Sequence, residues 1–452
     1  MRRLLFIFLF VLTLFSQETD YVTVVGDSLI GKVVDGKNIR EVIGNVVITQ
    51  GDFVINCNRA LQYLTDNEIE LIGSVVVTQD TMKIRTEKAY YYGDEKIAVS
   101  DTSVFLNQPG MELQADRGKY FIDQKRAEFF GRVILEDSNS FTLKSEELFY
   151  FKELERLNAS GNVEIIDSTS IIFTDSLEHF REDQNSFAFG NVRVENFENN
   201  IVIFGDTLVN DNQNSFSKVT GRPLFMQIDT SNTGRLDTLF VGSKILESYN
   251  DSTKRFVAID SVKIIRGEFA SVNQKSIFYN DANRIETFKE EGETEQPIIW
   301  FEDSQLVGDS IYIHLNENRL EWIDVKNKSI IISKNENYDW RYDQISGEQI
   351  KLFFNDSTIA RTEVFSNVLS IYYLFEEGEP SGLVKSSAQR GKIIFEDGKV
   401  VDVRLYVSPI SEYHPENLVK GVEREFTLPL FKLYGNRPVK TELIKLIRER
   451  NE

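Results

Sequence analysis

Side chains that commonly carry catalysis or bind metals are sparse in this sequence. The three histidines, His179, His314 and His414, lie far apart, at no spacing typical of metal ligands. Cys57 is the single cysteine, so no internal disulfide is available, and we expect this residue to be a small apolar filler. No phosphate-binding glycine loop, Gly-x-Ser-x-Gly motif or His-Glu-x-x-His motif is present. The sequence therefore argues against an enzyme, and we expect neither a metal nor a cofactor.

The carboxylates recur along the chain instead of forming one singular cluster. A catalytic acid would be unique, whereas acidic residues stand at corresponding positions of a repeat: Glu87, Asp116, Glu146, Asp175, Asp206 and Asp309. We interpret them as polar groups satisfied at a bend in each repeat. The net charge of −20 argues against nucleic acid as a partner, because its phosphates would be repelled.

The repeat that carries these residues has a period of about 29 residues. Its marker is a short motif, Gly-Asn-Val in its strongest form, which we call the node. Six nodes follow one another at intervals of 29, 29, 29, 30 and 29 residues: Gly44, Gly73, Thr102, Gly131, Gly161 and Gly190. Weaker nodes begin at Gly221, Asp260 and Ser366. This period indicates a repeat architecture in which each unit packs on its neighbours.

The parity of apolar residues predicts strands. After each node, apolar residues alternate with residues that tolerate charge, which is typical of a half-buried strand. A second pattern lies between the nodes, as in Ile84, Glu87 and Ala89, and its odd spacing predicts a bulge at the polar residue. Glycine at the node permits a bend in the complementary strand. The repeats therefore predict stacked, bent hairpins that form two facing sheets around an apolar trough.

The chain is predicted to have four parts. Residues 1–16 have a basic start and a short apolar run, as a secretory signal peptide does. A regular array follows at 17–280, and an irregular continuation with an acidic insertion at 281–405. The remainder, 406–452, is a proline-containing tail that can end in a short helix from Lys440.

The node itself carries a resemblance to a known family. Gly-Asn-Val-Val-Ile-Thr-Gln-Gly at 44–51, with the strand at 53–60, closely resembles the repeat of OstA-like, LptA-type lipopolysaccharide-transport proteins, and the amino-terminal domain of LptD. The resemblance covers roughly residues 22–370. It implies an all-β, elongated and twisted β-jellyroll, or β-taco, whose interior shields lipid acyl chains. The implied function is a non-enzymatic periplasmic bridge or shuttle that passes lipopolysaccharide toward the outer membrane, with which it could associate. The implied partners are lipopolysaccharide and other Lpt or OstA-family proteins, joined edge to edge by β-augmentation.

The resemblance also implies a set of lipid-binding residues. By position, the interior candidates are Val46, Ile48, Ile55, Val75, Val77, Ile84, Val104, Leu106, Leu113, Val133, Leu135, Leu143, Val163 and Ile165. Aromatic residues such as Phe53, Tyr91, Tyr120 and Tyr150 fit either a lipid-lined groove or an ordinary core between sheets. The alternative function is a structural or adhesive β-solenoid with a filled core and no lipid cargo. The two functions differ in whether the trough closes or stays open along one edge.

Overall fold

The computed structural model describes residues 22–448, except 35, 139–140, 231–235, 290–291, 293, 317–318, 336, 356–357 and 397–398. The predicted signal peptide lies outside the described residues. Antiparallel strands make up most of the described chain and helices only short stretches, so the all-β prediction is confirmed. No helix in these ranges is long and apolar enough to cross a membrane.

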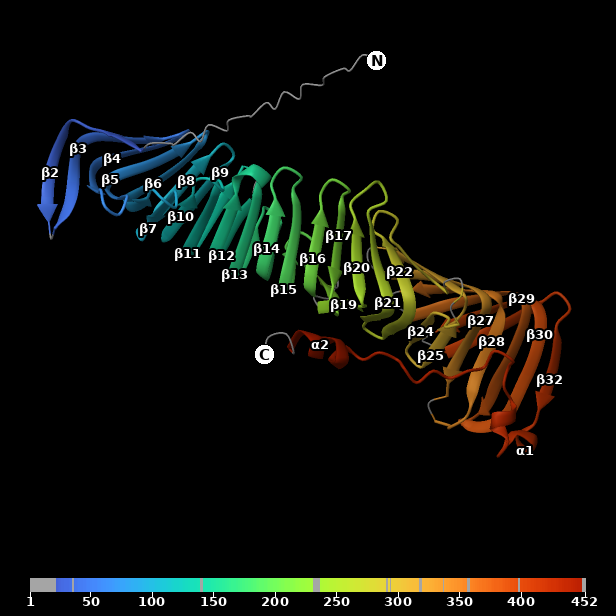
Figure 1. The fold of residues 1–452 in the computed structure, drawn as a ribbon. Helices are drawn as coiled ribbons and strands as arrows, with labels where there is room; N and C mark the ends of the chain where they lie inside the picture. The colour runs from blue at the N-terminus through green and yellow to red at the C-terminus, as the bar shows by residue number, and fades with distance from the viewer. Residues whose placement is uncertain are drawn as a thin grey trace, which may run out of the picture. The chain divides into compact units, whose positions relative to one another are not determined.

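The chain divides into two compact units. Unit 1 comprises Met1–Ser140 and Glu146–Glu153, and unit 2 comprises Phe141–Ser145 and Leu154–Glu452. Strand β12 (Phe141–Phe151) contributes to both. The other strands of unit 1 are β1 (Thr23–Val25), β2 (Ser28–Val34), β3 (Lys37–Gln50), β4 (Phe53–Tyr63), β5 (Glu68–Gln79), β6 (Met82–Tyr92), β7 (Ile97–Ser100), β8 (Val104–Gln108), β9 (Met111–Ala115), β10 (Arg117–Phe121) and β11 (Arg126–Asp137) (Figure 1).

Unit 2 continues the array after a 3₁₀ turn at Lys152–Leu154. Its first strands are β13 (Arg156–Ile166), β14 (Ser170–Phe180), β15 (Asn185–Asn196), β16 (Ile201–Asp211), β17 (Phe216–Thr220), β18 (Leu224–Thr230), β19 (Leu236–Gly242), β20 (Ile245–Tyr249), β21 (Arg255–Arg266) and β22 (Phe269–Tyr279). The later ones are β23 (Arg284–Phe288), β24 (Ile298–Phe301), β25 (Ser304–Val307), β26 (Ser310–Asn316), β27 (Arg319–Lys334), β28 (Tyr342–Asn355), β29 (Thr358–Glu376), β30 (Glu379–Glu396), β31 (Lys399–Tyr406) and β32 (Ile410–His414). Helix α1 (Glu416–Val419), a 3₁₀ turn at Glu423–Glu425 and helix α2 (Lys440–Arg448) follow.

The predicted bends lie at the nodes. The register between β14 and β15 shifts between Phe173 and Ser176, and the register between β15 and β16 shifts between Phe189 and Val192, at the node. Gly190 there has φ +80° and Asn191 φ +45°, so two successive residues occupy the left-handed region. A Cβ on Gly190 would lie 2.2 Å from a carboxylate oxygen of Asp175, which accepts a 3.0 Å hydrogen bond from Asn191. The recurring acidic residue therefore satisfies polar groups at the bend, as predicted.

Nodes without glycine show how far the pattern extends. At Thr102 the strand is interrupted, and β7 and β8 replace one continuous strand. In the later repeats Asn327 and Lys328 form a node with φ of +61° and +49°, and the register of β27 and β28 shifts there. The sequence did not predict this node, because a glycine marked the stronger ones and asparagine takes over its left-handed conformation here.

The two halves of each bent strand belong to different arms of the folded sheet. In β6, Lys83–Arg85 pair with β8, whereas Tyr90–Tyr92 pair with β7. We call the halves that follow the nodes, such as Val75–Gln79, the first arm, and the halves that precede them, such as Glu68–Ile72, the second arm. Alternate residues of both arms face one interior.

The tail forms a strap, residues 416–448, on the outer face of the first arm of unit 2. Val419 and Leu428 join a buried cluster with Trp300, Ile332 and Tyr373. Gln344 clamps the strap backbone twice, donating to Phe426 O at 3.1 Å and accepting from Leu428 N at 2.8 Å. Gln305 does the same with Lys432 O and Tyr434 N. The predicted short helix is present as α2, which lies beside β19 in Figure 1.

Candidate functional site

The candidate site is the interior face of the first arm. In unit 1 its side chains form one row across six strands, because each residue is the antiparallel partner of the next. The row, which we call the closed row, is Ile48, Ile55, Val77, Ile84, Leu106 and Leu113. In unit 2 the corresponding row, which we call the open row, is Ile165, Ile172, Val194 and Ile203.

The structure places the fourteen predicted lipid-binding residues inside the array. Thirteen of them are buried, and Ile165 is half-buried. Burying each aliphatic side chain of this size contributes about 1.5–3 kcal/mol, so these residues together contribute a large part of the stability of the array. Contact of these residues with acyl chains stays a prediction.

The closed row lies in a filled interior. Phe53, Met82 and Met111 occupy one corresponding position in three successive hairpins of the first arm, and each is at most 2% exposed. The Phe53 ring contacts the ring of Tyr91 on the second arm, with 5.6 Å between centroids. A cavity of about 20 Å³ lies between the arms, lined by Val77, Ile84 and residues of the second arm. That is room for one water molecule, and it is too small for an acyl chain.

Three hydrogen-bonded pairs join the tips of the two arms in unit 1, and we call them the clasps. Tyr91 donates its hydroxyl to the side-chain oxygen of Gln50, and Tyr120 donates to that of Gln79. In the third clasp Gln108 Nε2 donates to the Tyr150 hydroxyl at 2.7 Å. The glutamines are 29 residues apart and the tyrosines 29 and 30, so the clasps follow the repeat. Burial raises the pKa of Tyr91 to about 12 and also raises that of Tyr120, so both hydroxyls remain donors at neutral pH.

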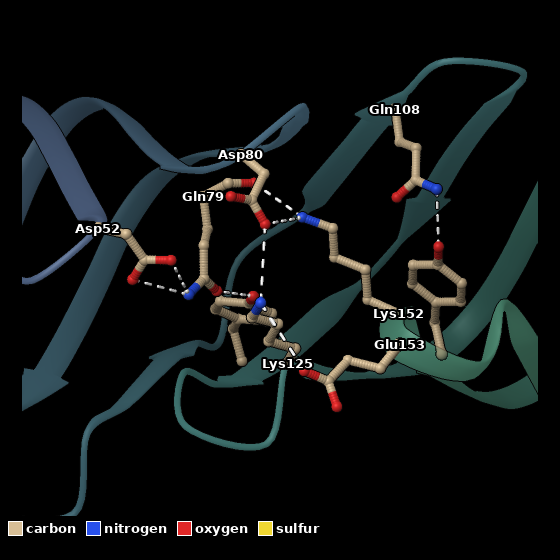
Figure 2. A network of polar contacts seen from close by, with 9 residues as sticks. Asp52, Gln79, Asp80, Gln108, Lys125, Lys152 and Glu153 are labelled. Atoms are coloured by element: carbon tan, nitrogen blue, oxygen red, sulfur yellow. Dashed lines mark hydrogen bonds and ion pairs between the residues drawn. The ribbon is translucent and has the colours of Figure 1, made fainter.

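Charged groups surround the middle clasp (Figure 2). Lys152 donates to Gln79 O at 3.1 Å and to Asp80 at 2.8 Å, and Gln79 Nε2 lies 3.2 Å from both carboxylate oxygens of Asp52. Lys125 adds ion pairs to Asp80 at 3.9 Å and Glu153 at 3.7 Å. The bond from Lys152 lowers the pKa of Asp80, so this carboxylate is ionised at neutral pH. The turn before β6 is thereby tied to the end of β12.

The open row lies in repeats whose clasp positions carry other residues. Asn210 stands at the tyrosine position and accepts a 2.8 Å hydrogen bond from Ser217 in its own hairpin. Asp167 stands at the glutamine position and accepts bonds from Thr169 and Ser170 in its own turn. Ser170 replaces the large Phe or Met of the earlier repeats. All four residues of the open row are half-buried, whereas Val77 and Ile84 of the closed row are only 4% and 8% exposed.

The interior of unit 2 fills again beyond the open row. Ile203 pairs with Phe225, whose ring lies 4.8 Å from that of Phe256 on the second arm. Phe256 in turn lies 5.3 Å from Phe278. Solvent therefore reaches the apolar row between β13 and β16, a span of roughly 14 Å at the spacing of neighbouring strands.

Sequence reasoning found the apolar rows but missed the glutamines of the clasps. By the alternation of residues along each strand, Gln50, Gln79 and Gln108 stand on the interior side. A polar residue beside a turn is, however, ordinarily solvated. The signal that could have found them is their spacing, which equals that of the tyrosines. Within the described residues no group of three or more His, Cys, Asp and Glu side chains could hold a metal ion.

Comparison with known proteins bears on the repeat. The family model described as OstA-like protein matches residues 22–108 and 99–181. The predicted resemblance to OstA-like proteins is confirmed for this part of the chain. The OstA-like part includes the closed row, the clasps and the first two residues of the open row.

No curated protein matches the chain. One similar solved structure is the crystal structure of LptH, the LptA-homologous periplasmic component of the lipopolysaccharide transport device of Pseudomonas aeruginosa. It is 16% identical and covers 32% of this chain and 94% of that chain, with a TM-score of 0.18. At these values the likeness carries no argument about function.

Proposed function

We propose that this protein is a non-enzymatic carrier that holds the acyl chains of lipopolysaccharide against its interior rows and passes the lipid toward the outer membrane. The observation that carries the proposal is the open row, a line of four apolar side chains that solvent reaches, which begins in the part of the chain that matches the OstA-like model. Apolar surface of this kind gains free energy when an acyl chain replaces water. The proposed location is the periplasm or the periplasmic face of the outer membrane, reached by export with the signal peptide at 1–16.

The proposed partners are other Lpt or OstA-family proteins that dock at free sheet edges. Strand β2 pairs with β3 on one side, and all seven of its residues are exposed. Strands β31 and β32 pair with β30 and expose Val403 and Ile410. Among the described residues no other strand pairs with these edges, and such edges with exposed apolar side chains support β-augmentation by another strand.

Photo-crosslinking tests the carrier function. A photoreactive amino acid at Val194, in the open row, is expected to capture lipopolysaccharide in cells. The matched control is Arg193, the next residue of the same strand, which faces outward and lies over the Phe173 ring. Equal capture at the two positions would contradict the proposal.

A filled β-solenoid without cargo remains the second candidate, because the closed row has no room for a lipid. It predicts no capture at Val194, Ile84 or Val133. It also predicts that no lipid co-purifies with the protein from its native envelope, which mass spectrometry would measure.

A further inference from the structure

The clasps close the interior of unit 1 by side-chain contacts across its mouth. Each glutamine lies at the tip of the first arm and each tyrosine near the tip of the second arm. In Figure 2, Gln108 points toward its tyrosine partner, while Lys152 reaches across to Gln79 and Asp80. The three clasps therefore occupy successive positions along one mouth.

All clasp residues except the half-buried Gln50 are buried, which makes the bonds difficult to lose. Tyr91, Tyr120 and Tyr150 are at most 2% exposed, and so is Gln79. A buried hydroxyl or amide that loses its partner without reaching water is strongly disfavoured. Opening the mouth therefore needs either water or a polar ligand group to replace the bonds.

The open row shows what the array does without clasps. Each unit by itself has hairpins with the same node geometry and an apolar row, but the residues at the clasp positions differ between the two. The interior row becomes accessible in the same repeats in which Asn210 and Asp167 bond within their own hairpins. The row is therefore buried where glutamine and tyrosine occupy the clasp positions, and solvent reaches it where other residues do.

We infer that the three glutamine–tyrosine clasps are specificity-determining residues that bar acyl chains from the closed row and direct them to the open row. The inference rests on the proposed carrier function, since the ligand is the same lipid. Each tyrosine hydroxyl bonds the glutamine of the facing arm, and its ring fills the space that a chain would enter. Loss of the hydroxyls removes the link between the arms while the rings remain.

Alkylation of an engineered cysteine tests the clasps without any lipid. Cys57 is the only cysteine, so Cys57→Ala gives a cysteine-free background, and Val77→Cys places a thiol in the closed row. In the variant Tyr91→Phe, Tyr120→Phe and Tyr150→Phe, the alkylation rate of this thiol is expected to rise roughly tenfold, as when a buried hydrogen bond is lost. An unchanged rate in the folded variant overturns the inference.

The matched control is Tyr90→Phe, because Tyr90 lies on the same strand as Tyr91 but faces outward. It is expected to leave the rate unchanged, and an equal rise would also overturn the inference. Circular dichroism confirms folding. If the triple variant does not fold, Tyr120→Phe alone carries the same comparison.

A photoactivatable fatty acid separates the clasp inference from the carrier function. The expected result is labelling of β13–β16 in the wild type and additional labelling of β5 and β6 in the triple variant. Faster alkylation with no fatty-acid labelling in either unit would contradict the carrier function and leave the clasps as barriers. Labelling of β13–β16 without faster alkylation would overturn the clasps alone.

Discussion

At the scale of single residues, polar groups of the array divide into those whose hydrogen bonds recur with the repeat and those whose bonds do not. The node carboxylates and the clasps recur with the repeat and have partners from neighbouring hairpins. Asp343 has no counterpart in the regular repeats. Its half-buried side chain lies in β28, and the carboxylate accepts a 2.9 Å hydrogen bond from the backbone N–H of Tyr373.

Asp343 is expected to make stability depend on pH. Burial raises its pKa from 3.8 to about 7, against a smaller opposing effect of the Tyr373 bond. Between pH 4 and 7 the folded state therefore holds a proton that the unfolded state has lost, so this group's contribution to stability falls as pH rises and levels off above pH 7. Asp343→Asn keeps the acceptor oxygen and removes the titration. The variant should be more stable than the wild type at pH 8, and the difference should shrink toward pH 4 in urea denaturation. A difference that does not vary with pH would contradict the assignment.

At the scale of elements, the strap is the part of unit 2 that does not belong to the repeat. Phe240 of β19 alternates with Val241, which continues the interior row, so Phe240 faces outward. On that outer face Leu224, Phe240 and Ile265 form a cluster with Leu443 of α2. The strap thus makes the outer face of these strands a second apolar layer.

Leu443→Ala is expected to free α2 from the array. Leu443 is 3% exposed, and truncation of a buried leucine costs about 2–5 kcal/mol. A helix as short as α2 is not stable in water without such packing. Hydrogen exchange should then become faster in α2 and on β19, while β13–β16 remain protected. Glu442→Gln is the control on the same helix. It removes only the exposed 3.3 Å ion pair with Lys263, worth about 0–1 kcal/mol. Equal exchange in the two variants would show that Leu443 does not anchor the helix.

At the scale of the whole molecule, the sequence predicted those features of the fold that are set locally and recur with the repeat. The node motif and the parity shift predicted the bends, because left-handed conformation and pleat are set within a few residues. The strap could not be predicted in the same way. Its clamps join Gln305 and Gln344 to residues 82 to 129 positions away, and its prolines interrupt any periodic pattern. The difference between closed and open rows also escaped prediction, since it depends on which side chains meet across the arms. The predicted part boundaries at 280 and 405 stay predictions.

Free sheet edges predict that whole molecules associate head to tail. The joint would pair β2 of one copy with β31 and β32 of another. Apolar residues that are exposed on both edges would become buried there. Val33 is 71% exposed on β2 and Ile410 is 63% exposed on β32, so Val33→Asp and Ile410→Asp each place an unpaired charge in the joint. Phe105→Asp, an exposed position on β8 within the array, is the control that should leave association intact.

The expected outcome in sedimentation velocity separates this joint from unspecific association. Wild-type protein should form larger species as concentration rises, and each edge variant alone should remain a monomer. In an equal mixture of the two variants, Val33→Asp still offers an intact β31 and β32 edge, and Ile410→Asp still offers an intact β2 edge. It should therefore form dimers and nothing larger, because a heterologous joint with one blocked end at each partner cannot propagate. Association of either edge variant alone, or of the mixture beyond dimers, would show that the copies meet through another surface.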